Sequence, residues 1–213
     1  LIIGSKSAAR EVSGSASFLD ETDLDRFDQI DLRKVLNQVA GVYIREEDGF
    51  GLRPNIGIRG AAAERSQKVT LMRDGVLITP APYSAPAAYY VPNVSRIGSV
   101  EVLKGPSATA YGPHTVGGAI NFGSLPLPVV SSEGFVDLSA GSDGFYKLQG
   151  SYGENSGDFG FLVDVLSYGA DGFKYIDEIG GDTGFERNDV GLKMSYVAPD
   201  SRFDHRVTLL VEA

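Results

Sequence analysis

The sequence predicts an α+β domain over residues 1–128, followed by antiparallel β-strands over residues 129–213. Helix, strand and hairpin signals are mixed in the first part, whereas the second part alternates between apolar and polar residues. The first part has 13 Lys and Arg against 13 Asp and Glu. The second has 6 against 15, so the whole net charge of −9 lies there. This acidic balance argues against nucleic acid as a partner. The proline-containing segment at residues 125–128 (LPLP) marks the boundary.

Two helices are expected early in the first part. Four apolar residues at positions i, i+3, i+4 and i+7 predict a helix over residues 31–39. Asp28 or Asp31 can cap its start, and Gly41 lies where a left-handed residue commonly follows a helix. A shorter helical turn is expected over residues 21–27. The apolar positions of the longer helix are Leu32, Val35, Leu36 and Val39.

Short strands are expected over residues 42–44 and 100–103, where apolar residues follow one another. Gly105 and Pro106 end the second of these strands, and a one-turn helix is expected over residues 107–110.

A β-hairpin is predicted where the segments 69–73 and 76–78 flank Asp74 and Gly75. Both central residues of a type I′ turn need positive φ, and Asp-Gly supplies them at low cost. Four prolines and several tyrosines then predict an irregular loop over residues 79–92.

Five segments of the second part alternate between apolar and polar residues. Segments of about ten residues with this period are typical of transmembrane β-strands, which turn one side to lipid and the other to the lumen. A soluble antiparallel sandwich alternates in the same way, so alternation by itself leaves both interpretations open. The segments span residues 135–140, 146–152, 159–166, 189–196 and 203–212, with a longer connection over 170–187.

In the membrane interpretation, polar side chains face the lumen and aromatic residues near the strand ends form interfacial girdles. Five strands cannot close a barrel, so we expect the chain to be part of a longer protein. The expected lumen-facing charges are Lys147, Asp164, Lys193 and Arg206. The expected girdle residues are Phe135, Tyr152, Phe159, Tyr168, Tyr196 and Phe203.

Four motifs follow one another in the first part: residues 55–60 (NIGIRG), 72–76 (MRDGV), 100–106 (VEVLKGP) and 111–121 (YGPHTVGGAIN). Their order and spacing resemble the plug domain of TonB-dependent outer-membrane receptors. The resemblance covers residues 10–128 as plug. It implies an α+β plug domain, a small mixed sheet with short helices, followed by the first four to five strands of a transmembrane β-barrel of about 22 strands. Residues 81–86 (APYSAP) make the plug most similar to those of ferric dicitrate receptors.

The resemblance implies a receptor of the bacterial outer membrane, with the plug inside the barrel and its amino terminus facing the periplasm. The implied function is energised uptake of a ferric chelate of the siderophore or ferric citrate type, without a cofactor of its own. The implied partners are that chelate, outer-membrane lipid and the TonB–ExbB–ExbD inner-membrane complex, reached through a segment upstream of residue 1.

Two groups of site residues follow from the resemblance. We expect Arg59, in the Ile-Arg-Gly strand, to form an ion pair with a carboxylate of the barrel wall. We expect Lys104 to take part in the same ion pairing between plug and barrel. The family usually has Arg at this position, and Lys cannot pair with a carboxylate in bidentate fashion. Apical plug loops are expected to bind an anionic chelate through charge-assisted hydrogen bonds. For each position the simpler alternative is a solvated strand or turn residue. The expected ligand-binding residues are Arg65, Ser66, Gln67, Tyr83, Ser84, Tyr89 and Tyr90.

Two other classes of function fit the sequence less well. An enzyme needs a nucleophile and a base, but Cys is absent and no G-x-S-x-G motif occurs. His114 and His205 lie far apart in sequence without clustered acids, so we expect no metal site and no catalytic site. The alternative to a receptor is a soluble β-rich module for ligand binding or adhesion, which would fractionate without detergent.

Overall fold

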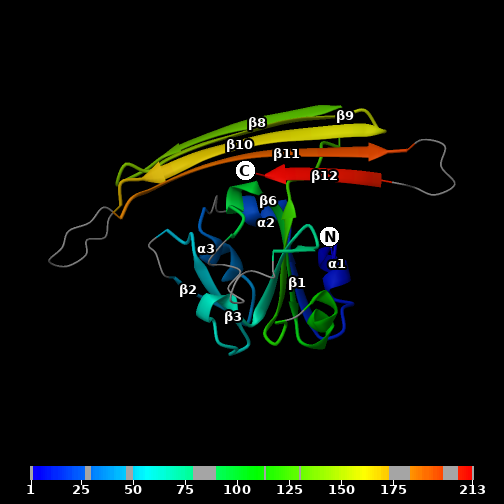
Figure 1. Cartoon of the computed structure of the whole chain (residues 1–213), viewed down its shortest axis with the longest axis vertical. Helices are drawn as coiled ribbons and strands as arrows, with labels where there is room; N and C mark the ends of the chain where they lie inside the picture. The colour runs from blue at the N-terminus through cyan, green and yellow to red at the C-terminus, as the bar shows by residue number, and fades with distance from the viewer. Residues whose placement is uncertain are drawn as a thin grey trace. The chain divides into compact units, whose positions relative to one another are not determined.

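The computed structural model describes residues 2–26, 30–46, 50–78, 90–112, 114–129, 131–172, 183–198 and 206–212. The chain forms two units, Leu1–Leu125 and Pro126–Ala213, both drawn in Figure 1. The division falls inside the proline-containing segment at residues 125–128, three residues before the expected boundary.

Unit 1 is built on a five-stranded sheet with the order β1-β6-β7-β4-β5. β4 and β7 run parallel, and the other neighbouring pairs are antiparallel, which confirms the expected mixed sheet. The strands are β1 (Ser15–Leu19), β4 (Val69–Arg73), β5 (Val76–Leu77), β6 (Ile97–Lys104) and β7 (Gly118–Ser124).

Apolar side chains pack on both faces of this sheet. Val102 and Ile120 belong to a large buried cluster, whereas their neighbours Leu103 and Ala119 belong to a smaller one, because successive strand residues point to opposite faces. Burying one large aliphatic side chain contributes about 1.5–3 kcal/mol. Short helices add little by themselves in water, so these two clusters supply most of the stability of unit 1.

In the part of unit 1 that the structure describes, the α-helices are short: α1 (Lys6–Ala9), α2 (Glu21–Asp25) and α3 (Leu32–Leu36). α3 is shorter than the helix expected over residues 31–39. After Leu36 the amides of Gln38 and Val39 donate to carbonyls three residues back, so the chain tightens out of α-helical geometry. Asp31 caps α3 by accepting from the Arg33 N–H at 2.7 Å, and Gly41 has the expected positive φ of 80°.

The β4–β5 hairpin has the expected type I′ turn. Asp74 has a φ of 50° and Gly75 a φ of 83°, and Met72 and Arg73 pair with Leu77 and Val76.

A second, two-stranded antiparallel sheet joins β2 (Val42–Glu46) and β3 (Pro54–Ile58). The Tyr43 ring lies over Gly57, where a Cβ atom would overlap it, and the Tyr43 hydroxyl donates to the Ala61 carbonyl. The described residues of unit 1 also form the 3₁₀ helices η1 (Glu64–Ser66), η3 (Val94–Arg96) and η4 (Pro106–Tyr111). The last contains the turn expected over residues 107–110.

Unit 2 is one antiparallel sheet whose five strands follow the chain, in the order β12-β11-β10-β9-β8 (Figure 1). This confirms the expected antiparallel region. In the described part of the chain, no helix is long and apolar enough to cross a membrane. The strands are β8 (Ser132–Ala140), β9 (Tyr146–Asn155), β10 (Phe159–Ala170), β11 (Phe185–Val197) and β12 (Arg206–Glu212).

The sheet of unit 2 has one apolar, exposed face. Val136 and Leu138 are more than 70% exposed, and the apolar residues of the other strands continue this face. The opposite face carries polar residues, among them Lys147, whose ammonium lies 2.6 Å from an Asp137 carboxylate oxygen. The exposed apolar side chains include Tyr146, Leu148, Tyr152, Phe159, Val163, Val165, Val190, Tyr196, Val207, Leu209 and Val211.

Two of the expected girdle residues lie on the polar face instead. Tyr168 pairs with Lys147 across β10 and β9, and its ring packs edge-on against Phe185 with centroids 5.2 Å apart. Phe135 pairs with Ser151. Ser151 lies on the face opposite to that of its exposed neighbour Tyr152, so Phe135 lies on that opposite face too. The girdle prediction was wrong for Phe135 and Tyr168 because it counted aromatics near strand ends without regard to the face that each strand position takes. Phe203 lies outside the described residues.

Candidate functional site

Arg59 lies directly after β3, not within the expected strand, and its φ is 52°. A positive φ costs a non-glycine residue about 1–3 kcal/mol, and such strain collects at functional positions. The Arg59 N–H donates to the Gly41 carbonyl at 2.8 Å, which holds this backbone in place. Arg59 is exposed as a residue, and its Nη1 would lie 3.2 Å from a Cβ atom built on Gly105. Glycine at residue 105 therefore leaves room for the Arg59 side chain beside β6.

Lys104, at the end of β6, points into unit 1 and is only 4% exposed. Its ammonium donates to the Ala40 carbonyl at 2.9 Å and to the Ser17 hydroxyl at 3.3 Å. Burial lowers the pKa of the Lys104 ammonium, and the neighbouring charge of Arg59 lowers this pKa further. Two cations therefore lie side by side at the ends of β3 and β6.

The two expected ion-pairing residues thus differ. Arg59 is exposed and its guanidinium is available to a carboxylate, whereas the Lys104 ammonium is held by groups of unit 1. Among the residues that the structure describes, no carboxylate lies within ion-pair distance of either cation. In this structure the Lys104 ammonium donates to acceptors of unit 1, and its expected ion pair with the barrel stays a prediction.

The segment from Arg65 to Gln67 forms a turn around η1. Arg65 and Ser66 have φ values of 50° and 55°, and the Arg65 N–H donates to the Asn55 Oδ1 atom at 2.5 Å. The Ser66 side chain is fully buried: its Oγ accepts from the Ile56 N–H at 3.0 Å and donates to the Pro54 carbonyl at 3.2 Å. Ser66 therefore shapes the loop in this structure, and its expected contact with the ligand stays a prediction.

The other expected ligand-binding residues divide by exposure. Arg65 is exposed and Gln67 is half-buried, so both side chains reach the surface of unit 1. Tyr90 is 37% exposed. Tyr83, Ser84 and Tyr89 lie outside the described residues, and their role stays a prediction.

Glu101 forms the centre of a polar cluster that was not predicted from the sequence. It lies in β6 with no exposed surface, and its carboxylate accepts four hydrogen bonds, all from amide N–H groups. Oε1 accepts from the Ile3 and Gly4 backbones at 2.8 Å each. Oε2 accepts from the Ile2 backbone at 2.8 Å and from the Asn121 side chain at 2.6 Å. These bonds compensate the desolvation of a buried charge.

Asn121 extends this cluster toward the β4–β5 hairpin. Its Oδ1 accepts from the Gly75 N–H at 2.8 Å, while Asp74 Oδ1 accepts from the Ser124 N–H at 2.9 Å. A sequence signal for the cluster existed. Glu101 interrupts an apolar strand and Asn121 interrupts another, and the two residues pair across β6 and β7.

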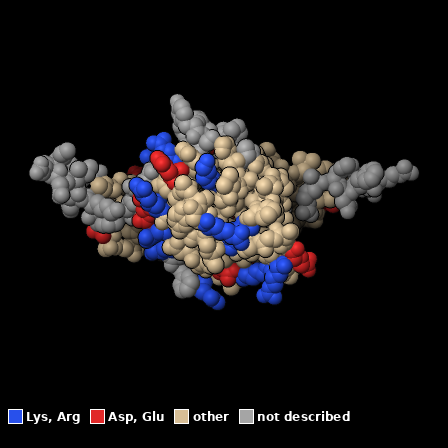
Figure 2. Space-filling view, turned by 90° about the horizontal axis from the view of Figure 1, so that it is seen from below, with Lys and Arg blue, Asp and Glu red and all other residues tan. Residues whose placement is uncertain are grey.

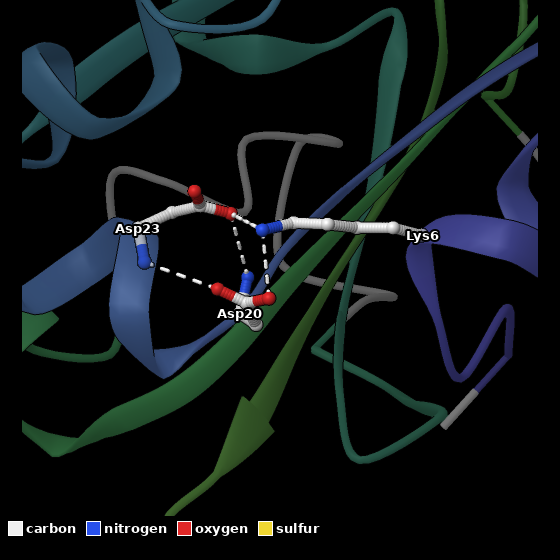
Figure 3. Close-up of polar contacts among 3 residues, drawn as sticks. All are labelled: Lys6, Asp20 and Asp23. Carbon is white, nitrogen blue, oxygen red and sulfur yellow. Dashed lines mark hydrogen bonds and ion pairs between the residues drawn. The ribbon is translucent and has the colours of Figure 1, made fainter.

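Lys6 makes a second attachment, to Asp20 and Asp23 (Figure 3). Its ammonium lies 2.7 Å from an Asp20 oxygen and 2.6 Å from an Asp23 oxygen. Asp20 and Asp23 also form the capping box of α2, with hydrogen bonds of 3.1 and 3.2 Å. The bonds to Asp20 and then Asp23 raise the pKa of Lys6, and the bond to Lys6 lowers the pKa of Asp20.

Residues 2–6, here called the leading segment, are thus attached to unit 1 at two points. The Glu101 carboxylate binds the backbone of residues 2–4, and the acids of α2 bind Lys6. Figure 2 shows the face seen from below, where Lys and Arg side chains are scattered between uncharged surface and acids lie beside them at the margins. The arrangement holds a segment and presents separate basic groups; it does not form a continuous charged patch on this face.

Residues 8–119, slightly more than half of the chain, match the family model described as TonB-dependent Receptor Plug Domain. Among curated proteins, the chain is 28% identical over 192 residues to the Vitamin B12 transporter BtuB of Photobacterium profundum, covering 90% of this chain and 30% of that protein. It is 30% identical over 164 residues to BtuB of Vibrio vulnificus, covering 69% of this chain and 26% of that protein. The chain thus spans less than a third of the length of these relatives.

Solved structures of receptors share the fold. The ferric citrate transporter FecA, unliganded, matches with a TM-score of 0.71 and 23% identity, over 93% of this chain and 31% of FecA. The siderophore receptor PirA from Acinetobacter baumannii matches with a TM-score of 0.70 and 18% identity, over 98% and 32%. The ferric yersiniabactin uptake receptor FyuA from Yersinia pestis gives 0.68 and 24%, over 92% and 30%. The plug sheet followed by antiparallel strands is therefore the fold of this chain.

Proposed function

The chain belongs to the TonB-dependent receptor plug domain family, and we propose that it forms the plug and first barrel strands of an outer-membrane importer of a ferric chelate. The observation that carries this proposal is the order of the two units. A plug sheet that matches the family is followed by five antiparallel strands with an exposed apolar face. An apolar face of this kind suits contact with outer-membrane lipid. The soluble β-rich module offers no explanation for this combination.

The chelate binds to exposed polar groups of the plug in this proposal. Arg65 and Gln67 present a guanidinium and an amide from a turn held by buried hydrogen bonds, so little ordering is needed on binding. A guanidinium makes charge-assisted hydrogen bonds to carboxylate or catecholate oxygens. The structural neighbours named for ferric citrate and siderophores support an Fe(III) chelate as cargo.

Binding of the chelate cannot by itself drive its transport against a concentration gradient, so the energy for uptake comes from outside the chain. We assign this role to the TonB–ExbB–ExbD complex, acting through a segment upstream of residue 1. No bond in the cargo has to break, so the proposed function requires no catalytic residue and no cofactor.

Arg59 holds the plug to the barrel wall in this proposal. It is the exposed member of the cation pair at the ends of β3 and β6, and a carboxylate of the barrel would neutralise it. Arg59→Ala in the full-length receptor is expected to lower the thermal stability of the plug and to reduce uptake, with Arg53→Ala, at another exposed arginine, as control. A variant with unchanged plug stability and unchanged uptake would refute this role.

A corrinoid is the second candidate cargo, because the two curated relatives are vitamin B12 transporters. The test uses the full-length receptor in a bacterial strain that lacks its own receptors for both cargoes. Uptake of radiolabelled ferric citrate and of radiolabelled cyanocobalamin is measured with and without an uncoupler. Uncoupler-sensitive uptake of ferric citrate supports the proposal. Uptake of cyanocobalamin alone would show that the cargo is a corrinoid and not a ferric chelate. If neither compound is imported, uptake of a panel of ferric siderophores is measured under iron starvation.

A further inference from the structure

The leading segment places three successive backbone N–H groups on one carboxylate. Ile2, Ile3 and Gly4 each donate to Glu101 at 2.8 Å. Gly4 has a φ of 81°, and successive N–H groups of a backbone curved in this way point to the same side, as in anion-binding nests. No atom lies within 4 Å of the position of a Gly4 Cβ, so glycine is needed there for its conformation and not for space.

The same residues pack against apolar surface. Ile2 and Ile3 contact a small buried cluster on one face of the sheet, and Leu77 of β5 packs against that cluster too. The cluster itself consists of Met72, Leu103, Ala108 and Ala119. The leading segment is therefore held by side-chain packing as well as by the carboxylate.

The Lys6 attachment differs from the Glu101 attachment in its exposure. The Lys6 side chain is about half exposed, and exposed ion pairs of this kind contribute little to stability. Glu101, by contrast, is fully buried in the second strand of the sheet, where hydrogen bonds to a charged group are strong. Glu101 is thus the principal attachment of residues 2–6.

The order of the segments along the chain determines which contacts a force applied at the amino terminus reaches first. Residues 2–4 precede β1, and β1 pairs along its whole length with β6, the strand that carries Glu101. A pull from the amino-terminal side reaches the bonds to Glu101 before it reaches the β1–β6 ladder. Breaking those bonds leaves the carboxylate with only the Asn121 amide among the donors that hold it now.

We propose that Glu101 is a positioning residue, the latch that fixes the leading segment to the plug and must open before force unfolds β1. The source of the pull rests on the proposed function, whereas the latch itself is a property of the folded plug. Release is all-or-none in this scheme, because three donors share one carboxylate and the loss of one weakens the geometry of the others.

Hydrogen exchange in the purified full-length receptor tests the latch. Glu101→Gln keeps the side-chain size but removes the charge and one acceptor oxygen. We expect the amides of residues 2–4 to exchange at least about tenfold faster than in the wild type, while amides of β4 and β7 keep their protection. Glu11→Gln, the same change at an exposed position, serves as control. Unchanged protection of residues 2–4 in Glu101→Gln overturns the proposal.

A second variant approaches the latch from the other side, in case Glu101→Gln fails to fold. Ile3→Pro removes one donor without touching the core strand, and Ile3→Val keeps that donor and most of the packing. Faster exchange at Ile2 and Gly4 in the proline variant alone supports the latch. Equal exchange in the two variants contradicts it.

Force spectroscopy on the full-length receptor, pulled from its amino terminus, examines the order of events. The wild type should show an early rupture before β1 unfolds, and Glu101→Gln should lose this rupture. A wild type in which β1 unfolds without an earlier event rules out the mechanical role. Neither exchange nor force measurements involve uptake, so a receptor that imports no ferric chelate would disprove the proposed function and leave the latch standing.

Discussion

Glu101 and Asn121 face each other across β6 and β7, and the Asn121 side-chain amide donates to Glu101 Oε2 at 2.6 Å in the buried part of the sheet. Asn121 also accepts from the Gly75 N–H of the hairpin turn. One amide side chain thus connects the carboxylate that holds the leading segment with the turn between β4 and β5.

Asn121→Leu should destabilise the plug by about 2–3 kcal/mol, because it leaves a buried carboxylate short of one donor and the Gly75 N–H without its acceptor. The measurement is the urea midpoint of the plug transition in the full-length receptor. Thr109→Val, which removes a hydroxyl from an exposed turn, serves as control. A midpoint in Asn121→Leu equal to that of the control would argue against a structural role for this pair.

Two glycines with positive φ should respond very differently to alanine. At Gly118 a Cβ atom would lie 2.4 Å from the Leu103 carbonyl oxygen, so β6 and β7 would have to separate. We expect Gly118→Ala to cost several kcal/mol, about 3 or more. At Gly60 nothing lies within 4 Å, so Gly60→Ala bears only the backbone strain, about 1 kcal/mol. Thermal unfolding of both variants measures the two losses of stability. A loss in Gly118→Ala no larger than that in Gly60→Ala would contradict the role of close packing at residue 118.

Substitutions at Ser66 and at Arg65 should have opposite effects: one should lower the stability of the plug and the other its affinity for the ligand. Ser66→Ala removes the acceptor of a buried Ile56 N–H and should destabilise the plug by about 1–3 kcal/mol. In a variant that remains folded, affinity for ferric citrate should change little. Arg65→Ala should do the reverse, lowering affinity about tenfold with little change in stability, since its side chain is exposed. Calorimetric titration and thermal unfolding of both variants decide the matter, and equal affinity in wild type and Arg65→Ala removes Arg65 from the site.

The contribution of the Lys6–Asp20 ion pair to the stability of the plug should change only at strongly acidic and strongly basic pH. The pKa of Asp20 is lowered in the fold, so its contribution is complete above the ordinary aspartate pKa and is lost as pH falls through the folded value. The pKa of Lys6 is raised, so its contribution is lost only as pH rises through a value above that of a free lysine. NMR titration of Lys6→Gln should show a higher Asp20 pKa than the wild type. An unchanged pKa would mean that the pair does not persist in solution.

Lys104 should titrate below an ordinary lysine, because burial and then Arg59 oppose its charge. Below the folded pKa both folded and unfolded chains carry the proton. Between the folded pKa and the higher unfolded pKa the unfolded chain binds more protons, so this residue adds stability as pH rises. NMR of methyl-labelled lysines should show a smaller depression of the Lys104 pKa in Arg59→Gln. Arg53→Gln is the control, and identical Lys104 titration in all three proteins contradicts the proximity of the two cations.

Local signals in the sequence were enough for several elements. Asp74-Gly75 predicted the type I′ hairpin because few residues tolerate two consecutive positive φ values, and Asp31 was correctly proposed as a cap of α3. The alternation after residue 128 predicted antiparallel strands because its period is a property of the strand alone. The length of α3 and the girdle assignments of Phe135 and Tyr168 failed where packing and strand register decide.

The sequence by itself determined the family, through the order and spacing of four motifs, and the order of the two units, through the change of pattern after residue 128. It also determined most of the short elements, because each of these depends on neighbours within a few residues. Only the tertiary structure decided which polar side chains face inward. Ser66 and Lys104 are buried by contacts with Ile56 and Ala40, segments that no local pattern connects to them. The leading segment meets Glu101 almost one hundred residues away, and a bond between such distant positions exists only once the sheet has formed.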